Sequence, residues 1–462
     1  MSEVTPDTLF GGPTKRFFVS MLTRDIELAD AILDLVDNCI DGAMRSQPDF
    51  ADKETPFKGF KASLTVTPEK FEISDNCGGI PADYIEEAFQ LGRPNIKKDG
   101  DLPTVGMYGI GMKRAIFKMG KNATVYSNAK DGAFSVNYSS GWLDPENTEW
   151  DLPISRSERE EGVEGVQIQI PELKEQISKT FGNDSFINSL MADIQDHFGY
   201  LMQKGFAVSV NGIDLVPKTL VLHSAAHSAQ NEIRSFDYTG NHDGVDIRVT
   251  VGFFRALVQE TEIDKETKAP SESEAAGISV ICNDRVILLG DRTMKTGWGD
   301  AGVPRYHPQF RAIAGLIEFR SNDAEKLPIS TTKRGLDAGS DVYFVARKAV
   351  TEGLKTFTSF TNRFKGIEEE ANQFFEKATR SDVKKEISLA EEHGVPVRGA
   401  VAKKYVPVLP EPTNKTIRNR ISFVKAEDEV KAVSEYLFND SSQKPAIVGA
   451  ECFDRFLKEA KK

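Results

Sequence analysis

One stretch decides how this sequence folds: Ala31-Ile-Leu-Asp-Leu-Val-Asp-Asn-Cys-Ile-Asp-Gly-Ala43. At about 100° per residue it predicts a helix over residues 25–45 with two different faces. The apolar face carries Ile32, Leu35, Val36, Cys39 and Ala43, and the polar face carries Asp34, Asp37, Asn38 and Asp41. A carboxylate can orient or deprotonate a water molecule, and an amide oxygen is a suitable ligand for Mg²⁺. The helix alone also fits a solvated acidic surface.

Composition sets the limits for the rest of the chain. Its 462 residues suggest two to four domains, and 39% hydrophobic with 28% charged residues is typical of a globular protein. The net charge of -12 argues against a dedicated nucleic-acid binder. We find no run of 18 apolar residues and no secretory signal, so we expect no membrane span and a cytoplasmic protein. The four cysteines are widely spaced, so we expect reduced thiols and no zinc motif.

A second motif follows a predicted hairpin. Residues 63–67 and 70–74 alternate in polarity as strands do, and Asp75-Asn-Cys-Gly-Gly79 comes directly after them. Glycines behind an aspartate permit a tight turn with close backbone approach. Asp75, fixed at a strand end, could accept a hydrogen bond from an exocyclic amine such as that of adenine. The same residues also fit an ordinary turn.

A third motif, Gly106-Met-Tyr-Gly-Ile-Gly111, opens a predicted helix that ends near Met119. Free backbone N–H groups at such a helix start suit a polyphosphate, and Lys113 adds a cation in the first turn. The preceding residues 92–104 are rich in Gly, Pro, Lys and Asp, which predicts a loop or lid. The motif is neither a P-loop nor a dinucleotide-binding fingerprint, because the required spacing and strand context are absent.

In this order, the three motifs resemble the nucleotide-binding domain of the GHKL superfamily, which includes DNA gyrase B, the ninety-kilodalton heat-shock chaperone, histidine kinases and MutL. The resemblance implies a Bergerat-fold α/β sandwich that binds ATP and Mg²⁺. It assigns Asn38 to the metal, Asp75 to the adenine amine, and Gly109, Gly111 and Lys113 to the phosphates. The predicted nucleotide site also includes Gly79, Gly106, Ile110 and Met112.

The resemblance extends to about residue 350. Strands at 207–320 followed by Thr331-Thr-Lys333 look like a transducer domain, in which Lys333 would reach the γ-phosphate; a plain surface lysine is the alternative. Residues 283–287 and 111–113 look most like MORC-type ATPases and their bacterial relatives.

Two positions depart from the family pattern. Asp34 occupies the place of the glutamate that is usually the general base, which sets its carboxylate about 1.5 Å farther from the attacking water. Because a misplacement of about 1 Å can cost on the order of 10²-fold in rate, we expect slow hydrolysis. Val166 replaces a threonine that commonly supports the adenine-binding aspartate.

We therefore expect an α+β protein. Its predicted parts are an irregular arm (1–24) that could cross to a second subunit, the ATP-binding domain (25–175), a transducer-like domain (176–365) and a helical C-terminal region (366–462) with a linker near 394–413. The predicted function is a Mg²⁺-dependent ATPase whose ATP binding closes a homodimer, acting on DNA or in bacterial defence. A chaperone-like ATPase with protein clients, a histidine-type kinase and a nucleotide-binding scaffold with little turnover are the alternatives.

Overall fold

The computed structural model describes residues 14–24, 26–47, 54–90, 109–144, 146–225, 232–258, 275–330, 335–384, 388–413, 421 and 423–461, and every structural statement below refers to these residues. The chain forms two compact units, Met1–Pro412 and Thr413–Lys462.

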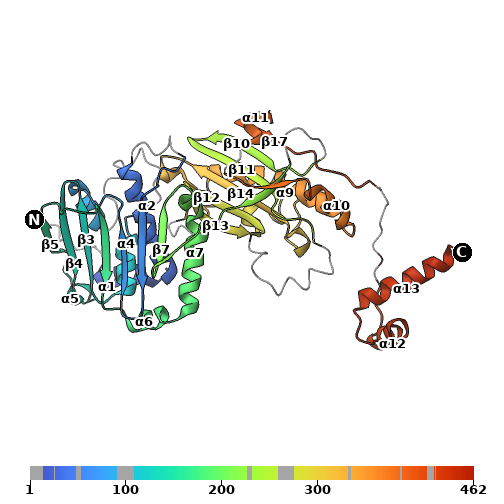
Figure 1. The fold of residues 1–462 in the computed structure, drawn as a ribbon, viewed down its shortest axis with the longest axis horizontal. Helices are drawn as coiled ribbons and strands as arrows, with labels where there is room; N and C mark the ends of the chain where they lie inside the picture. Colours follow the sequence, from blue (N-terminus) through green and yellow to red (C-terminus); the bar gives the residue numbers. More distant parts are fainter. Residues whose placement is uncertain are drawn as a thin grey trace, which may run out of the picture. The chain divides into compact units, whose positions relative to one another are not determined.

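The first unit contains an eight-stranded sheet in the order β5-β4-β3-β6-β2-β1-β7-β8 (Figure 1). Its strands are β1 (Lys61–Val66), β2 (Phe71–Asp75), β3 (Ala123–Ala129), β4 (Gly132–Tyr138), β5 (Ile154–Ser157), β6 (Gly165–Ile170), β7 (Ala207–Val210) and β8 (Ile213–Asp214). Strands β1 and β7 pair in parallel, whereas β1 and β2 form the predicted antiparallel hairpin. In β1 the residues alternate between buried and more exposed, because one face of the sheet is covered.

Helices cover that face. They are α1 (Lys15–Arg24), α2 (Leu28–Ser46), α3 (Ile85–Phe89) after the 3-10 turn η2 (Ala82–Tyr84), α4 (Gly111–Met119), α5 (Ser140–Leu143), α6 (Glu175–Phe181) and α7 (Asp184–Gln203). Ile32 of α2, Ile116 of α4 and Ile194 of α7 are fully buried in one core with the strands. This α/β sandwich confirms the predicted fold class, and α2 confirms the helix that the opening stretch predicts.

Two expectations about the first domain are wrong. Residues 15–24 form the helix α1 instead of an irregular arm, and the Lys15 ammonium donates hydrogen bonds to the carbonyls of Trp142 (2.7 Å) and Glu149 (2.5 Å). Residues 1–13 lie outside the described part. The sandwich also does not end at residue 175, because β7 pairs with β1 and β8 pairs with β7. Local sequence does not indicate which sheet a short strand will join.

A second sheet follows in the order β13-β12-β14-β11-β10-β17-β16. Its strands are β10 (Phe236–His242), β11 (Val245–Phe253), β12 (Gly277–Cys282), β13 (Arg285–Asp291), β14 (Ile313–Arg320), β16 (Val395–Pro396) and β17 (Val401–Tyr405). The 3-10 turns of this part are η5 (Met294–Thr296), η6 (Pro308–Phe310) and η7 (Ala324–Lys326). Helix α9 (Asp341–Arg363) packs on the sheet, with Phe253 edge-on against Phe357 at 5.0 Å between ring centroids.

The segment after α9 differs from the sequence prediction. The region expected to be helical, 366–462, begins with α10 (Glu368–Phe375), the strand β15 (Thr379–Asp382) and α11 (Leu389–His393). Strand β15 pairs with β9 (Val221–Ser224). The expected linker at 394–413 instead contributes β16 and β17, and β17 pairs with β10. Strands β15 and β17 both pair with partners more than a hundred residues earlier in the chain.

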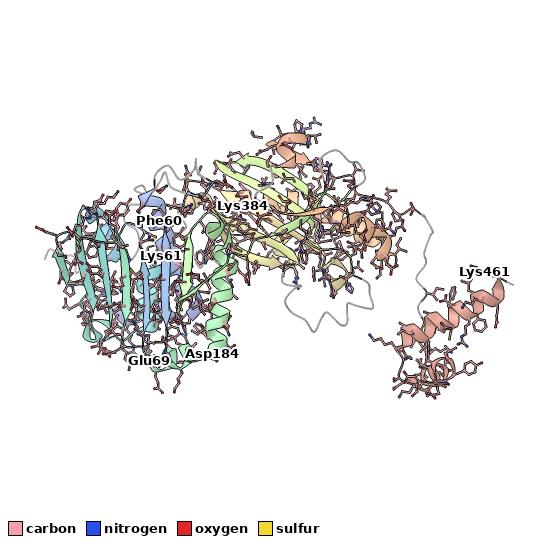
Figure 2. All side chains as sticks on the ribbon, viewed as in Figure 1. Phe60, Lys61, Glu69, Asp184, Lys384 and Lys461 are labelled. Carbon is pink, nitrogen blue, oxygen red and sulfur yellow. The ribbon has the colours of Figure 1, made fainter. Side chains whose placement is uncertain are left out.

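The turn between β12 and β13 joins the second sheet to the first domain. Asn283 and Asp284 both have positive φ (48° and 67°), as a two-residue hairpin turn of type I′ requires. The Asp284 carboxylate forms ion pairs with Lys204 and with Lys384, which is labelled in Figure 2. Lys204 caps α7, so the turn is fixed against a helix of the first domain.

The second unit, Thr413–Lys462, contains α12 (Glu427–Phe438) and α13 (Pro445–Ala460), so this part of the C-terminal region is helical as expected. Its large apolar side chains are mostly exposed; Tyr436 is 81% and Phe456 71% accessible. Among the described helices of the whole chain, none has both the length and the apolar character needed to cross a bilayer.

Candidate functional site

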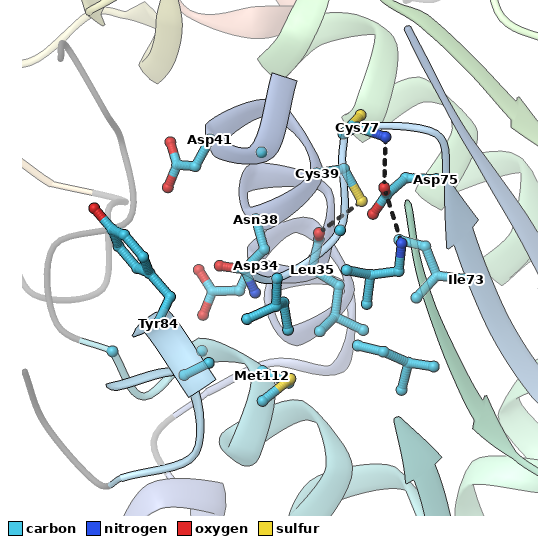
Figure 3. Close-up of a pocket in the computed structure, with 18 of the residues that line it drawn as sticks. Asp34, Leu35, Asn38, Cys39, Asp41, Ile73, Asp75, Cys77, Tyr84 and Met112 are labelled. Carbon is cyan, nitrogen blue, oxygen red and sulfur yellow. Dashed lines mark hydrogen bonds between the residues drawn. The ribbon is translucent and has the colours of Figure 1, made fainter. Parts of the chain in front are cut away.

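A pocket opens between α2, the turn after β2 and the start of α4 (Figure 3). It brings together most of the residues that the sequence predicts for the nucleotide site: Asp34, Asn38, Asp75, Gly79, Gly109, Ile110, Gly111, Met112 and Lys113. Gly106, Lys333 and the predicted lid at 92–104 lie outside the described residues. Three motifs that are separate in sequence therefore line one cavity.

At one end of the pocket, two backbone amides orient the Asp75 carboxylate. Its Oδ1 accepts hydrogen bonds from the N–H of Cys77 at 2.8 Å and the N–H of Val166 at 3.2 Å. Burial raises the pKa of Asp75, and these hydrogen bonds together with the charge of Arg45 partly offset that rise. Since both amides bind Oδ1, Oδ2 is the oxygen that can accept a hydrogen bond from a ligand amine. Val166 thus supports Asp75 through its backbone, which needs no hydroxyl.

The wall around Asp75 is apolar. Ile73, Ile168, Cys39 and Cys77 line it, and both cysteines are free thiols. Burial raises the pKa of the Cys77 thiol, and the neighbouring Asp75 carboxylate raises it further, so this thiol is protonated and a poor nucleophile. A flat apolar slot with one polar anchor is the arrangement that ligand pockets commonly have.

Two glycines let the backbone close around the pocket. Gly79 has φ of +72°, and a Cβ there would lie 2.3 Å from the carbonyl oxygen of Asn128. A Cβ on Gly111 would lie 3.2 Å from the Cβ of Asp34, so glycine allows the start of α4 to approach α2. The first turn of α4 therefore lines the pocket, and the N–H groups at a helix start can bind an anion.

Asn38 is the exposed residue within the otherwise buried stretch Ala31–Met44 of α2. Figure 3 shows its carboxamide beside the carboxylate of Asp34, both directed into the pocket. The Asn38 side chain makes no hydrogen bond within the described part of the chain. Its oxygen is thus available to a hard cation, and Mg²⁺ commonly takes few protein oxygens and completes its shell with water and phosphate. The residues fit a magnesium ion carried by a polyphosphate.

Asp34 has a partner that the sequence analysis missed. Arg114, on the first turn of α4, donates a hydrogen bond from Nη2 to Asp34 Oδ2, and the side chains are only 10% and 7% exposed. Arg114 Nε is buried without a hydrogen-bond partner in the described structure. The ion pair fixes the orientation of the Asp34 carboxylate and neutralises its charge.

Lys113 lines the pocket, but its ammonium faces backbone carbonyls. Nζ donates to the oxygens of Gln90 at 2.6 Å and Gly109 at 2.5 Å. In this arrangement Lys113 connects the end of α3 with the start of α4. A phosphate would have to share the ammonium with these carbonyls.

The polar face of α2 is divided between two environments. Asp37 is completely buried and accepts a hydrogen bond on Oδ1 from Arg285 Nε at 2.9 Å, and Arg285 belongs to β13 of the second sheet. Asn38, the next residue, faces the pocket. The sequence pattern shows both residues as one stripe and does not reveal this division.

Residues 26–176 match the protein family described as histidine kinase-, DNA gyrase B- and HSP90-like ATPase. This segment is therefore similar to GHKL ATPase domains. The matched range includes α2, both glycine motifs and the amide of Val166 that binds Asp75. The similarity of this segment to the superfamily supports ATP binding and, in general, ATPase activity. A search of curated proteins finds no match.

Two further pocket residues of the GHKL domain were missed. Arg45 and Tyr84 line the cavity, and the Arg45 guanidinium lies over the Tyr84 ring at 5.7 Å. Arg45 continues the polar spacing of Asp34, Asn38 and Asp41 by one more helical turn, a signal that could have identified it. Tyr84 and Arg114 carry no comparable signal, because their places follow from the packing of α3 and α4.

Proposed function

We propose that the pocket binds Mg²⁺-ATP, with adenine at Asp75 and the phosphates at the start of α4. The observation that supports this most is the convergence of Asp75, Asn38 and Gly109–Gly111 on one cavity. Asp75 Oδ2 would accept the adenine amine, the apolar wall would enclose the base, and the free N–H groups of α4 would bind the phosphates. Asn38 would hold the magnesium ion, which would neutralise phosphate charge.

For hydrolysis, we propose that Asp34 accepts the proton of the attacking water. Arg114 orients the carboxylate, but its hydrogen bond also occupies Oδ2, one of the two oxygens that could accept a proton from water. Together with the shorter side chain, this favours slow turnover. Lys333 stays a prediction for the γ-phosphate contact, since it lies outside the described residues.

The ion pair between Asp34 and Arg114 also favours a second candidate, a nucleotide-dependent switch with little turnover. In both cases we propose that ATP binding closes a homodimer, as in the MORC-type and MutL-like proteins that the sequence resembles, within the cytoplasm. The proposed partner is either DNA or a protein client. A salt-sensitive gel shift on long DNA would support the first, because phosphate contacts weaken with salt.

The primary test is equilibrium binding of ATP to the full chain and to Asp75→Ala, with phosphate release measured in parallel. We expect the wild type to bind ATP and Asp75→Ala to lose most of that binding. Equal binding by both proteins would refute the assignment of the adenine site. If the wild type and Asp34→Ala release phosphate at the same rate, the ATPase proposal fails and only the nucleotide-dependent switch is left. Cross-linking with a non-hydrolysable ATP analogue tests the dimer, and a monomer with the analogue bound would refute closure.

A further inference from the structure

We infer that Arg285 is a positioning residue for Asn38, acting through Asp37, so that the β12–β13 turn of the second sheet controls the magnesium-dependent part of nucleotide binding. This inference rests on the proposed function, because it concerns the same pocket. It differs from the predicted role of Lys333, since it involves a different turn and no contact with the nucleotide.

The Arg285 side chain is fixed by three contacts. Nε donates to Asp37 Oδ1 at 2.9 Å, Nη1 donates to the carbonyl of Val286 at 2.9 Å, and the guanidinium lies 4.1 Å from the centroid of the Phe198 ring. The side chains of Arg285 and Asp37 are 4% and 0% exposed. Solvent cannot reach either side chain. If one of them moves, the other must move with it, or the ion pair between two buried charges is broken, which is costly.

The turn that carries Arg285 is itself held in place. The neighbouring Asp284 forms ion pairs with Lys204 and Lys384, and Lys384 also binds Glu318 of β14 at 2.5 Å. Asn283 exchanges hydrogen bonds with Ser321, from Nδ2 to the Ser321 carbonyl at 3.0 Å and from the Ser321 N–H to Oδ1 at 3.1 Å. Arg285 therefore transmits the position of the second sheet, because its own backbone has little freedom to adjust.

On α2, Asp37 and Asn38 are consecutive and point about 100° apart around the helix axis. Asp37 is held by the turn of the second sheet, while Asn38 is directed into the pocket. A rotation or shift of α2 would move both side chains together, because the helix is a rigid element. The ion pair thus sets the direction of the Asn38 oxygen. By thermodynamic linkage, a magnesium-nucleotide that engages Asn38 must bias the position of the turn equally.

The test compares ATP affinity with excess Mg²⁺ and with EDTA, expressed as the ratio of the two affinities. Arg285→Lys keeps the positive charge beside Asp37 but loses the planar contact with Phe198 and the second donor. We expect this ratio to fall about tenfold, because mutation of a residue that orients a metal ligand commonly lowers metal affinity by that factor. The ATP affinity in EDTA should stay unchanged. A loss of folded protein would lower both affinities equally and leave the ratio as it is.

Phe198→Leu provides an independent variant, since it removes the ring under the guanidinium without unpairing a charge. We expect its ratio to fall in the same direction. Arg248→Lys is the matched control, because Arg248 pairs with Asp237 at 3.3 Å within the second sheet and does not line the pocket. Its ratio should equal that of the wild type.

A wild-type ratio in both folded variants would overturn the inference and leave ATP binding intact. If Arg285→Lys does not fold, the Phe198→Leu ratio decides alone, and a wild-type value overturns the inference. A wild-type chain that binds no ATP in either buffer would refute the proposed function itself, and the inference with it.

Discussion

Replacing Asp34 with Asn separates two roles of its carboxylate, the ion pair with Arg114 and the proposed acceptance of a proton from water. Both side chains are nearly buried, at 7% and 10% exposure. Asp34→Asn removes the carboxylate charge beside Arg114, and Arg114→Met removes the guanidinium charge beside Asp34. Each change should lower the free energy of unfolding by about 3–5 kcal/mol.

The double variant Asp34→Asn, Arg114→Met should lose less than the sum of the single losses, because no buried charge is then left alone. We expect a coupling energy of about 2 kcal/mol from guanidinium denaturation of the four proteins. The exposed pair Arg16–Glu146, with side chains 74% and 79% accessible, is the control, and breaking it should change stability by less than about 1 kcal/mol. Single losses that simply add, to within about 0.5 kcal/mol, would refute the buried ion pair.

Phosphate release completes this test. Asp34→Asn should reduce release by about 10²-fold or more, while ATP affinity changes little, because a general base acts on the attacking water and not on the bound nucleotide. Undiminished release in a folded Asp34→Asn protein would exclude Asp34 as the base.

Three further outcomes can be checked directly. Asp75→Ala should weaken ATP binding by about 10- to 100-fold, the value of a hydrogen bond to a charged group, measured by isothermal titration calorimetry; affinity equal to wild type would contradict the adenine assignment. Burial and the nearby Arg285 lower the pKa of His197 from its ordinary 6.5 to about 4, so His197 is neutral in the folded protein at neutral pH. Its contribution to stability is therefore fully present above pH 6.5 and is lost as the pH falls toward 4, because the unfolded chain binds the proton first. His197→Gln should flatten that part of the stability profile, and an unaltered pH dependence would argue against it. Lys15→Met should release α1, so that limited proteolysis within residues 15–24 accelerates, whereas the exposed Arg16→Ala should cleave at the wild-type rate; equal rates for both would show that Lys15 does not anchor the helix.

The sequence predicted the parts of the fold that depend on neighbours along the chain. The 3.6-residue pattern of α2, the alternation in β1 and β2 and the glycines before α4 are all local signals, and the structure confirms each element. Strand β17 was mistaken for a linker, because Val401–Tyr405 pairs along its whole length only with β10, and its local partner β16 contributes just Val395 and Pro396. Its pairing is a tertiary contact, which no pattern within the segment reveals.

The same distinction between local signals and tertiary contacts applies to the candidate site. Asp34, Asn38, Asp75 and Gly111 were identified because each lies in a short motif with its own chemistry. Their partners were not: Arg114 is 80 residues from Asp34, and Arg285 is 248 residues from Asp37. A charged residue on a helix face shows that a partner or solvent must be nearby, but which of the two it is depends on how the domains pack.

The close approach of Gly111 to Asp34 limits which side chains position 34 can accept. A glutamate at position 34 would carry one more methylene into a space bounded by the start of α4, where a Cβ on Gly111 would already lie 3.2 Å from Asp34. The longer side chain would also displace the guanidinium of Arg114. A glutamate at position 34 therefore fits this packing only if Arg114 moves or is itself replaced, which couples residues 34 and 114 in any redesign of the site.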